Sequence, residues 1–130
     1  MIRRAVADSS LLLVQAGTAA LWALPGEVAV SVVTAAELEL AVLGAREQEA
    51  RARRLARLSA LRSSFPLLEI NAQTASCFAH VADTALRRGL RPSVHQLWIA
   101  ALALQHDAAV ASLDPSFPEL GVTPLMRVDP

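Results

Sequence analysis

The sequence predicts one α/β domain over residues 1–130, with helices on both faces of a mainly parallel sheet. Hydrophobic residues make up 54% of the chain and charged residues only 18%, which is enough apolar material for a large core. Short apolar runs alternate with longer helical segments along the whole chain. The clearest run, VAVSVV at 28–33, has no polar alternation beyond Ser31, as expected for a strand covered on both faces.

The order of the elements follows from these runs and from the turn residues between them. Strands are expected at residues 3–7, 28–33, 67–70, 108–113 and 122–126. Helices are expected to open at 8–10 and to cover 34–44, 46–63, 72–88 and 93–106. Turn or cap residues punctuate this pattern at Pro25-Gly26, at Gly89 after a helix, and at Asp114-Pro115 after a strand.

Composition excludes several classes of protein. Twelve arginines balance twelve acidic residues, so the net charge is zero and any nucleic-acid binding needs a local patch. The single cysteine, Cys77, excludes an internal disulfide framework and a multi-cysteine metal site. The apolar run at 11–24 is shorter than the ~20 residues of a membrane span. We therefore expect a cytoplasmic protein that makes no use of a membrane.

Acidic residues follow three of the predicted strands. Asp8 comes directly after the first strand, Glu37 lies one helical turn past the second, and Asp114 follows the strand at 108–113. The carboxyl ends of parallel strands share one edge of a sheet, so these side chains are expected to meet there. Clustered carboxylates repel one another unless a cation is present. Mg²⁺ or Mn²⁺ prefers oxygen ligands, activates water and orients a phosphodiester, so the pattern indicates a metal site.

Each of these acids also fits a helix cap. Asp8 precedes a predicted helix, Thr34-x-x-Glu37 has the spacing of a capping box, and Asp114 precedes Pro115, as at a helix start. The residues alone leave the metal site and the caps both open, including an unrelated α/β domain whose acids are all caps.

Three segments, VADSSLLL, SVVTAAELELAV and SVHQLWIAALALQHDAAVASLDPSF, resemble the PIN-domain ribonucleases and, within them, the VapC toxins of toxin–antitoxin pairs. The resemblance implies a PIN-like three-layer α/β/α sandwich with a central mainly parallel sheet. It also implies a metal-dependent endoribonuclease in which Asp8, Glu37 and Asp114 bind Mg²⁺ or Mn²⁺, with Ser9 and Thr34 in support. Its implied partners are an RNA substrate, a second copy in a homodimer and a neutralising VapB-like antitoxin.

One position departs from the family pattern. The residue that opens the LWIAALAL helix is Gln96 where the family has an aspartate. Glutamine is neutral, so metal affinity and catalysis are both expected to fall. Ser93-x-x-Gln96 is itself a capping box, and the neighbouring His95 is expected on another face as a surface or packing residue. The alternative function is therefore a weakened or inactive PIN-like protein that binds antitoxin or RNA.

Arginines gather on two predicted helices. The candidates for RNA-phosphate contacts are Arg46, Arg53, Arg57, Arg87, Arg88 and Arg91. The alternative is a solvated helix face, in which Glu49 and Arg53 form an ordinary pair one turn apart. Both interpretations remain open from the sequence.

Overall fold

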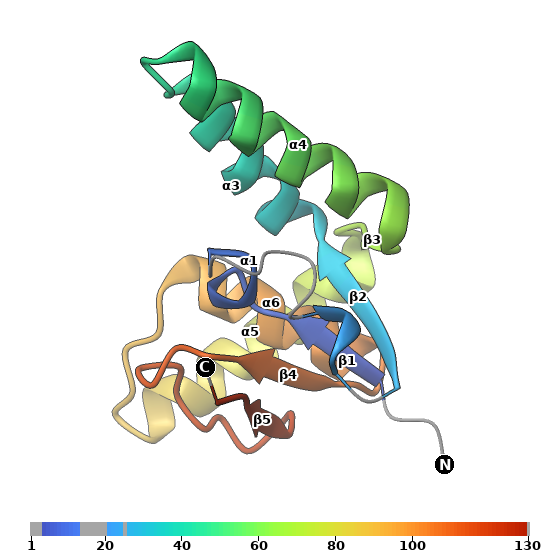
Figure 1. The fold of residues 1–130 in the computed structure, drawn as a ribbon. Coiled ribbons are helices and arrows are strands. Elements are labelled where there is room, and N and C mark those ends of the chain that lie inside the picture. The colour runs from blue at the N-terminus through green and yellow to red at the C-terminus, as the bar shows by residue number, and fades with distance from the viewer. Residues whose placement is uncertain (1–3, 14–20, 25, 130) are drawn as a thin grey trace.

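The computed structural model describes residues 4–13, 21–24 and 26–129. Its centre is a five-stranded sheet in the order β3-β2-β1-β4-β5, in which every neighbouring pair is parallel (Figure 1). The strands are β1 (Arg4–Ala7), β2 (Glu27–Ser31), β3 (Leu67–Leu68), β4 (Ala109–Ser112) and β5 (Leu125–Arg127). The predicted parallel sheet is confirmed, and β1 lies in its middle.

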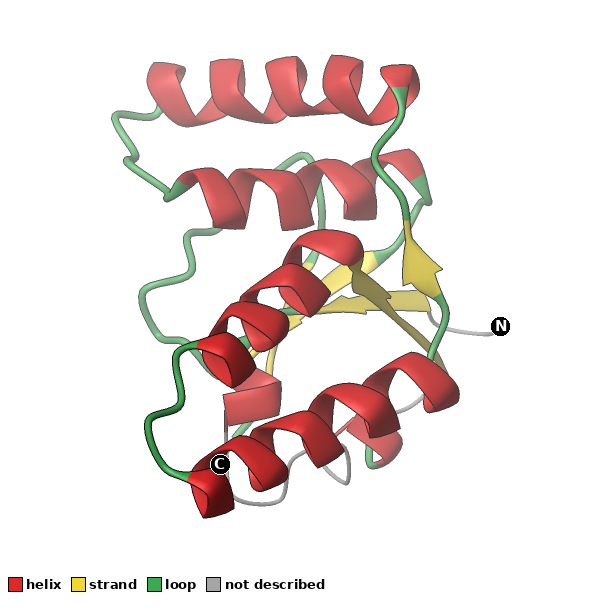
Figure 2. Ribbon diagram, turned by 90° about the horizontal axis from the view of Figure 1, so that it is seen from above, coloured by secondary structure: helices red, strands yellow, loops and turns green. Residues whose placement is uncertain are grey.

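Helices flank the sheet on both sides, which confirms the three-layer arrangement (Figure 2). They are α1 (Ser10–Leu13), α3 (Val32–Leu43), α4 (Gln48–Ser64), α5 (Ala72–Arg87) and α6 (Val94–Gln105). Alternate residues of β1 pack on opposite faces of the sheet. Ala5 and Ala7 are buried with α1, α3 and α4, whereas Val6 is buried with α6, on which α5 packs. The strands are therefore apolar on both sides, as the sequence indicated.

Capping side chains and a glycine explain where α5 begins and ends and where α6 begins. The side chain of Asn71 caps α5, and Gly89, with φ +69°, follows the C-cap residue of that helix. Ser93 caps α6, as predicted. Among the described residues, no helix combines the length and the apolar character that crossing a membrane requires.

Several predicted boundaries are wrong, and the third strand covers 67–68, not 67–70. The second strand ends at Ser31, because the Ser31 hydroxyl accepts a hydrogen bond from the Val33 backbone N–H and starts α3 there. The helix that was expected to open at Thr34 therefore begins at Val32. The last strand covers 125–127, not 122–126, and its first contact with β4 is the bond from Val110 N–H to the Pro124 carbonyl.

The α3–α4 hairpin extends away from the sheet, with its connecting turn at the far end (Figure 1). Side chains of α4 contact α3 and stabilise the hairpin. Arg54 donates to the Ala41 carbonyl at 2.7 Å, and Arg62 lies 3.5 Å from Glu39. The first turns of α3 lie beside the sheet, and most of the hairpin points away from it (Figure 1).

A candidate active site at the carboxyl ends of the strands

The strand order brings three chain segments together at one edge. Ala7, the last residue of β1, pairs with Val30 of β2 and with Ala111 of β4. The Asp8 backbone N–H continues the pairing by donating to the Ala111 carbonyl at 2.8 Å. Asp8 therefore lies between the ends of the two neighbouring strands, which is the position that the sequence analysis assigned to a site.

Asp8 is a buried carboxylate, with 4% of its surface exposed. Its Oδ2 accepts hydrogen bonds from Ser10 Oγ at 2.9 Å and Ser112 Oγ at 2.8 Å. No arginine or histidine pairs with it within the described part of the chain. The alternative interpretation, an N-cap, is not what the Asp8 side chain does, since both of these donors are hydroxyls. The result is a buried anion whose hydrogen-bond partners carry no charge.

Two serines of this network were not predicted from the sequence. Ser9 was the expected supporting residue, yet the hydroxyl that bonds to the Asp8 carboxylate belongs to Ser10. Ser112, the last residue of β4, donates to Asp8 and also accepts the backbone N–H of Asp114 at 3.0 Å. Serines beside a predicted strand end were the only signal in the sequence for either residue.

Asp114 lies just beyond β4 in a tight turn. Its Oδ1 accepts from the Ser116 hydroxyl at 2.7 Å and from the Ser116 backbone N–H at 2.8 Å. These two bonds, with the nearby Arg127 guanidinium, hold the pKa of Asp114 below its usual value. The residues after Asp114 form a turn rather than a helix, so this aspartate closes a local turn and caps no helix.

Glu37 and Thr34 lie on α3 but do not form the capping box that their spacing allows, because Ser31 caps this helix. Glu37 Oε1 instead lies 2.6 Å from Nδ1 of His95, the second residue of α6. Thr34 is fully buried, and its hydroxyl has no hydrogen-bond partner among the described residues. The sequence contained no indication of the Glu37–His95 contact.

Gln96 is engaged in the predicted capping box at the start of α6. Its Oε1 accepts the Ser93 backbone N–H at 3.0 Å, and its own backbone N–H donates to Ser93 Oγ at 3.1 Å. This prediction is confirmed, and the Gln96 side chain thus has a structural role.

The residues fit a divalent cation by donor type, since carboxylate and hydroxyl oxygens follow the carboxyl ends of neighbouring strands. The ligand sphere itself is not assembled in this structure. Among residues 4–13, 21–24 and 26–129, no three His, Cys, Asp or Glu side chains are close enough to share an ion. Asp8 is held by two serines, Glu37 by His95 and Asp114 by Ser116. In this arrangement the three carboxylates therefore do not form one shared ion site.

The candidate RNA-contacting arginines are exposed, apart from the half-buried Arg57. Arg53, Arg57 and Arg87 lie on helices, as expected, whereas Arg46, Arg88 and Arg91 lie in the segments between helices. Arg53 lies 3.6 Å from Glu49, the pair expected from their spacing, and Arg87 lies 2.9 Å from Asp83. Arg88 reaches the Glu119 carbonyl at 3.3 Å. Arg46 belongs to the α3–α4 turn, which Figure 1 places far from the sheet. These arginines thus do not form one continuous border around Asp8.

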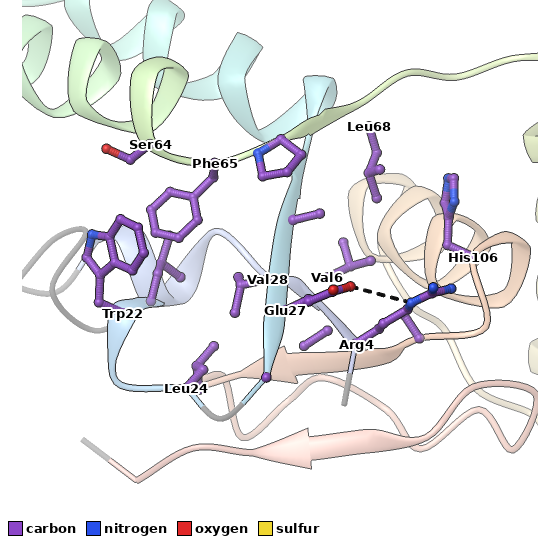
Figure 3. Close-up of a pocket in the computed structure, with 16 residues that line it drawn as sticks. Arg4, Val6, Trp22, Leu24, Glu27, Val28, Ser64, Phe65, Leu68 and His106 are labelled. Carbon is purple, nitrogen blue, oxygen red and sulfur yellow. Dashed lines mark ion pairs between the residues drawn. The ribbon is translucent and has the colours of Figure 1, made fainter. Parts of the chain in front are cut away.

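A cavity of about 610 Å³ lies at the opposite, amino ends of the strands (Figure 3). Arg4 and Glu27, the first residues of β1 and β2, line it and lie 3.6 Å apart. Trp22 packs against Phe65 beside it, with ring centroids 4.8 Å apart. The cavity is largely apolar and is separated from Asp8 by the length of β1, so it is not part of the candidate site.

Comparison with known proteins places this geometry in a family. A PIN-domain family model matches residues 14–122. Two curated relatives come from Mycobacterium tuberculosis. Ribonuclease VapC5 is 34% identical, and the match covers 75% of this chain and 71% of the relative. Ribonuclease VapC4 is 36% identical, and the match covers 87% of this chain and 88% of the relative.

Solved structures agree with this assignment. VapBC-5 of Mycobacterium tuberculosis, a member of the VapBC family of toxin–antitoxin systems, superposes with a TM-score of 0.83 and 31% identity, covering 96% of this chain and 98% of that one. VapBC2 of Rickettsia felis, bound to a promoter DNA fragment, has a TM-score of 0.80 at 16% identity and coverages of 97% and 99%, a likeness of fold. With a matching sequence model, relatives above 30% identity and an acidic strand edge, the chain belongs to the PIN-domain family and is of the VapC type.

Proposed function

We propose that this protein is the toxin of a VapBC-type pair, an endoribonuclease that hydrolyses RNA phosphodiester bonds with the help of Mg²⁺ or Mn²⁺. The observation that carries the proposal is the buried Asp8 carboxylate at the centre of the sheet edge. Two hydroxyls hold it, and no cationic side chain of the described residues pairs with it. Burial of an unpaired charge is costly, and a divalent cation is the natural compensation. The curated relatives are named ribonucleases, which agrees with this chemistry.

Asp8 is the proposed anchor of the cation, and Glu37 and Asp114 are the further carboxylate ligands. Ser112 couples two of them, because it bonds to the Asp8 side chain and to the Asp114 backbone. The buried Thr34 hydroxyl, which lacks a partner among the described residues, and the neighbouring Ser9 are the supporting groups. A bound cation would supply an activated water and neutralise charge on the phosphodiester.

The proposed partners are an RNA substrate, a cognate VapB-like antitoxin and a second copy of the chain, in the cytoplasm. Solved relatives are VapBC toxin–antitoxin complexes, which supports an antitoxin partner. Arg46, Arg53, Arg57, Arg87, Arg88 and Arg91 are the proposed contacts to RNA phosphates. Replacing an arginine that contacts phosphate should weaken RNA binding and flatten its dependence on salt concentration.

The neutral side chain of Gln96 favours a second candidate function. This neutral residue uses its side-chain oxygen in the α6 capping box, so it adds no charge to the edge. Metal affinity rises with the number of charged ligands, and a site with three carboxylates binds less tightly than one with four. The second candidate is therefore a catalytically weakened or inactive PIN-like protein that acts by binding antitoxin or RNA.

RNA cleavage in Mn²⁺ and in EDTA tests both candidates. The variants are Asp8→Ala, Gln96→Asp and the matched control Glu47→Ala, which removes an exposed acid before α4. The proposed nuclease cleaves RNA in Mn²⁺, and cleavage is lost in EDTA and in Asp8→Ala but not in Glu47→Ala. Cleavage only after Gln96→Asp supports the weakened protein. Full cleavage by Asp8→Ala would overturn the metal site.

A further inference from the structure

The cavity at the amino ends of the strands lies beside a stretch of β2 that is paired on one side only. β1 pairs with β2 along the whole length of β1. On the other side of β2, the pairing with β3 joins Val30 to Leu67 and Ser31 to Leu68. Residues 27–29 of β2 therefore have no partner strand on this side among the described residues, and all three line the cavity (Figure 3).

The backbone of Val28 is at the centre of this open edge. Residues two apart in a strand direct their N–H and C=O groups to the same side. Val30 N–H donates to the Pro66 carbonyl at 3.0 Å, so the backbone groups of Val28 also point to the β3 side. The next bond of the ladder would run from residue 66 to the Val28 carbonyl, but proline has no N–H. In the described part of the chain, no backbone hydrogen bond joins Val28 to β3 or to the end of α4.

Aromatic side chains line the cavity on one side of this edge. Phe65 belongs to the core cluster on the α3–α4 side of the sheet, and Val28 packs against that cluster. Trp22 packs against Phe65, yet 66% of the Trp22 surface is exposed. An exposed indole beside an apolar cavity is a contact surface for an apolar side chain, because covering it removes apolar area from water.

Polar side chains line the cavity on the other side of β2. Figure 3 places Arg4 and His106 there, across β2 from the two aromatic rings. The Arg4 guanidinium lies 3.6 Å from the Glu27 carboxylate, a separation too long for a hydrogen bond, and both side chains are more than half exposed. Such an exposed pair is weak. The guanidinium of Arg4 therefore keeps donors available for a carboxylate from another molecule.

We propose that this open edge of β2 docks a short extended segment of a partner protein, in which an apolar residue and an acidic residue are adjacent. The backbone of the segment pairs with Val28 and adds a strand to the sheet. Neighbouring residues of a strand point to opposite faces. The apolar side chain thus packs on Trp22 and Phe65, and the acidic side chain reaches Arg4.

The shape of the site favours an extended peptide over other occupants. The open stretch is three residues long, about 10 Å of strand. A purely apolar small molecule leaves the Val28 N–H and C=O unpaired, whereas a peptide pairs with them and also contacts both walls. So short an edge, closed by Pro66, admits only a short segment. Asp8 lies at the other end of β1, so the inference goes beyond the proposed nuclease and does not rest on it.

NMR titration of the 130-residue chain with blocked peptides tests the proposal. The probe is acetyl-Thr-Phe-Glu-Thr-amide. We expect the Val28 amide and the Trp22 indole resonances to shift, and the Val28 amide to exchange with solvent more slowly in the complex. One control peptide carries methyl groups on the backbone nitrogens of Phe and Glu, which removes the N–H donors, and it should not bind. A second control has Lys in place of Glu, and it should bind more weakly because Arg4 repels it.

Protein variants test the two walls of the cavity separately. Trp22→Ala should weaken binding of the glutamate peptide by about 2–10-fold, as expected for the loss of one aromatic contact. Arg4→Gln should remove the preference for the glutamate peptide over the lysine peptide. Leu40→Ala, at an exposed leucine of α3 outside the cavity, is the matched control and should bind as the unmodified chain does. The unfolding midpoint of each variant checks that it is folded.

Each contrary result would overturn the proposal in a different way. Equal shifts with the methylated peptide would exclude backbone pairing, and no shift at millimolar peptide, or shifts confined to residues outside the cavity, would exclude the site. Slow exchange of the Val28 amide in the free protein that is lost on dilution would assign the edge to a second copy. Slow exchange at every concentration would show that the chain covers the edge itself. RNA cleavage is not among these readouts, so their failure leaves the proposed function unchanged.

Discussion

Gln96 and Ser93 exchange two hydrogen bonds at the start of α6, each from the backbone N–H of one residue to the side-chain oxygen of the other. This reciprocal arrangement satisfies amide groups that the first turn of a helix otherwise leaves unpaired. Position 96 therefore contributes to the stability of α6, whatever its contribution to the acidic edge.

Removing the cap should reduce stability without removing the site. Ser93→Ala is expected to lower the free energy of unfolding by about 0.5–2 kcal/mol, because one N–H of the first turn loses its acceptor. Urea unfolding measures this change, and Ser59→Ala, at an exposed position on α4, is the control. Equal stability of the Ser93→Ala and Ser59→Ala variants would show that the capping bonds contribute nothing.

Neutralising Asp8 should stabilise the metal-free protein. Asp8→Asn keeps an oxygen that accepts from Ser10 and Ser112 but removes the buried charge. We expect the free energy of unfolding in EDTA to rise by about 0.5–2 kcal/mol, as is common when a functional site loses its strain. Added Mn²⁺ should stabilise the unmodified chain and not this variant. A less stable Asp8→Asn protein in EDTA would contradict this account.

The free energy of unfolding should depend on pH, because the pKa of Asp114 is lowered by the turn in which it lies. The folded-state pKa of Asp114 is lowered, chiefly by the Ser116 hydroxyl, so the unfolded chain binds a proton more readily. The resulting stabilisation is present above the unfolded value of about 3.9 and is lost as the pH falls through the lower folded-state pKa. Ser116→Ala should raise the pKa of Asp114 and lessen this acid-dependent loss.

A carboxyl ¹³C titration by NMR in metal-free buffer measures that pKa directly. Ser63→Ala is the control, since the Ser63 hydroxyl bonds to the Ser59 carbonyl on α4. An Asp114 pKa that stays the same in Ser116→Ala would rule out the hydroxyl as the main cause.

Two leucines on α3 should respond very differently to truncation. Leu38 is 5% exposed and belongs to the core that contains β1, whereas Leu40 is 69% exposed. Leu38→Ala is expected to cost about 2–5 kcal/mol in unfolding free energy, and Leu40→Ala less than about 0.5 kcal/mol. Guanidinium unfolding compares them. Similar losses would mean that Leu40 is covered in solution.

The fold was predictable where local signals were strong. Gly89 and Ser93 marked helix limits through their own backbone and capping preferences, and the apolar runs located all five strands. The end of β2 was not predictable from its composition. Val32 and Val33 continue a β-branched run, but the Ser31 hydroxyl bonds to Val33 and starts a helix there.

The location of the site was predictable from the sequence, but the contacts between its side chains were not. Parallel topology put Asp8 beside the end of β4, as expected. The sequence did not indicate that Ser112 would bond to Asp8 or that His95 would hold Glu37. Such contacts join residues far apart in the chain, and a single sequence contains no local pattern for them.

The bond between Asp8 and Ser112 spans 104 positions of the chain. Because β4 pairs with β1, the Asp8 side chain gains the Ser112 hydroxyl only when these two distant segments have come together in the sheet. Contacts of such long range form late, since they must overcome the entropy of closing a long loop. The acidic edge is therefore completed late in folding, after the sheet has joined these two segments.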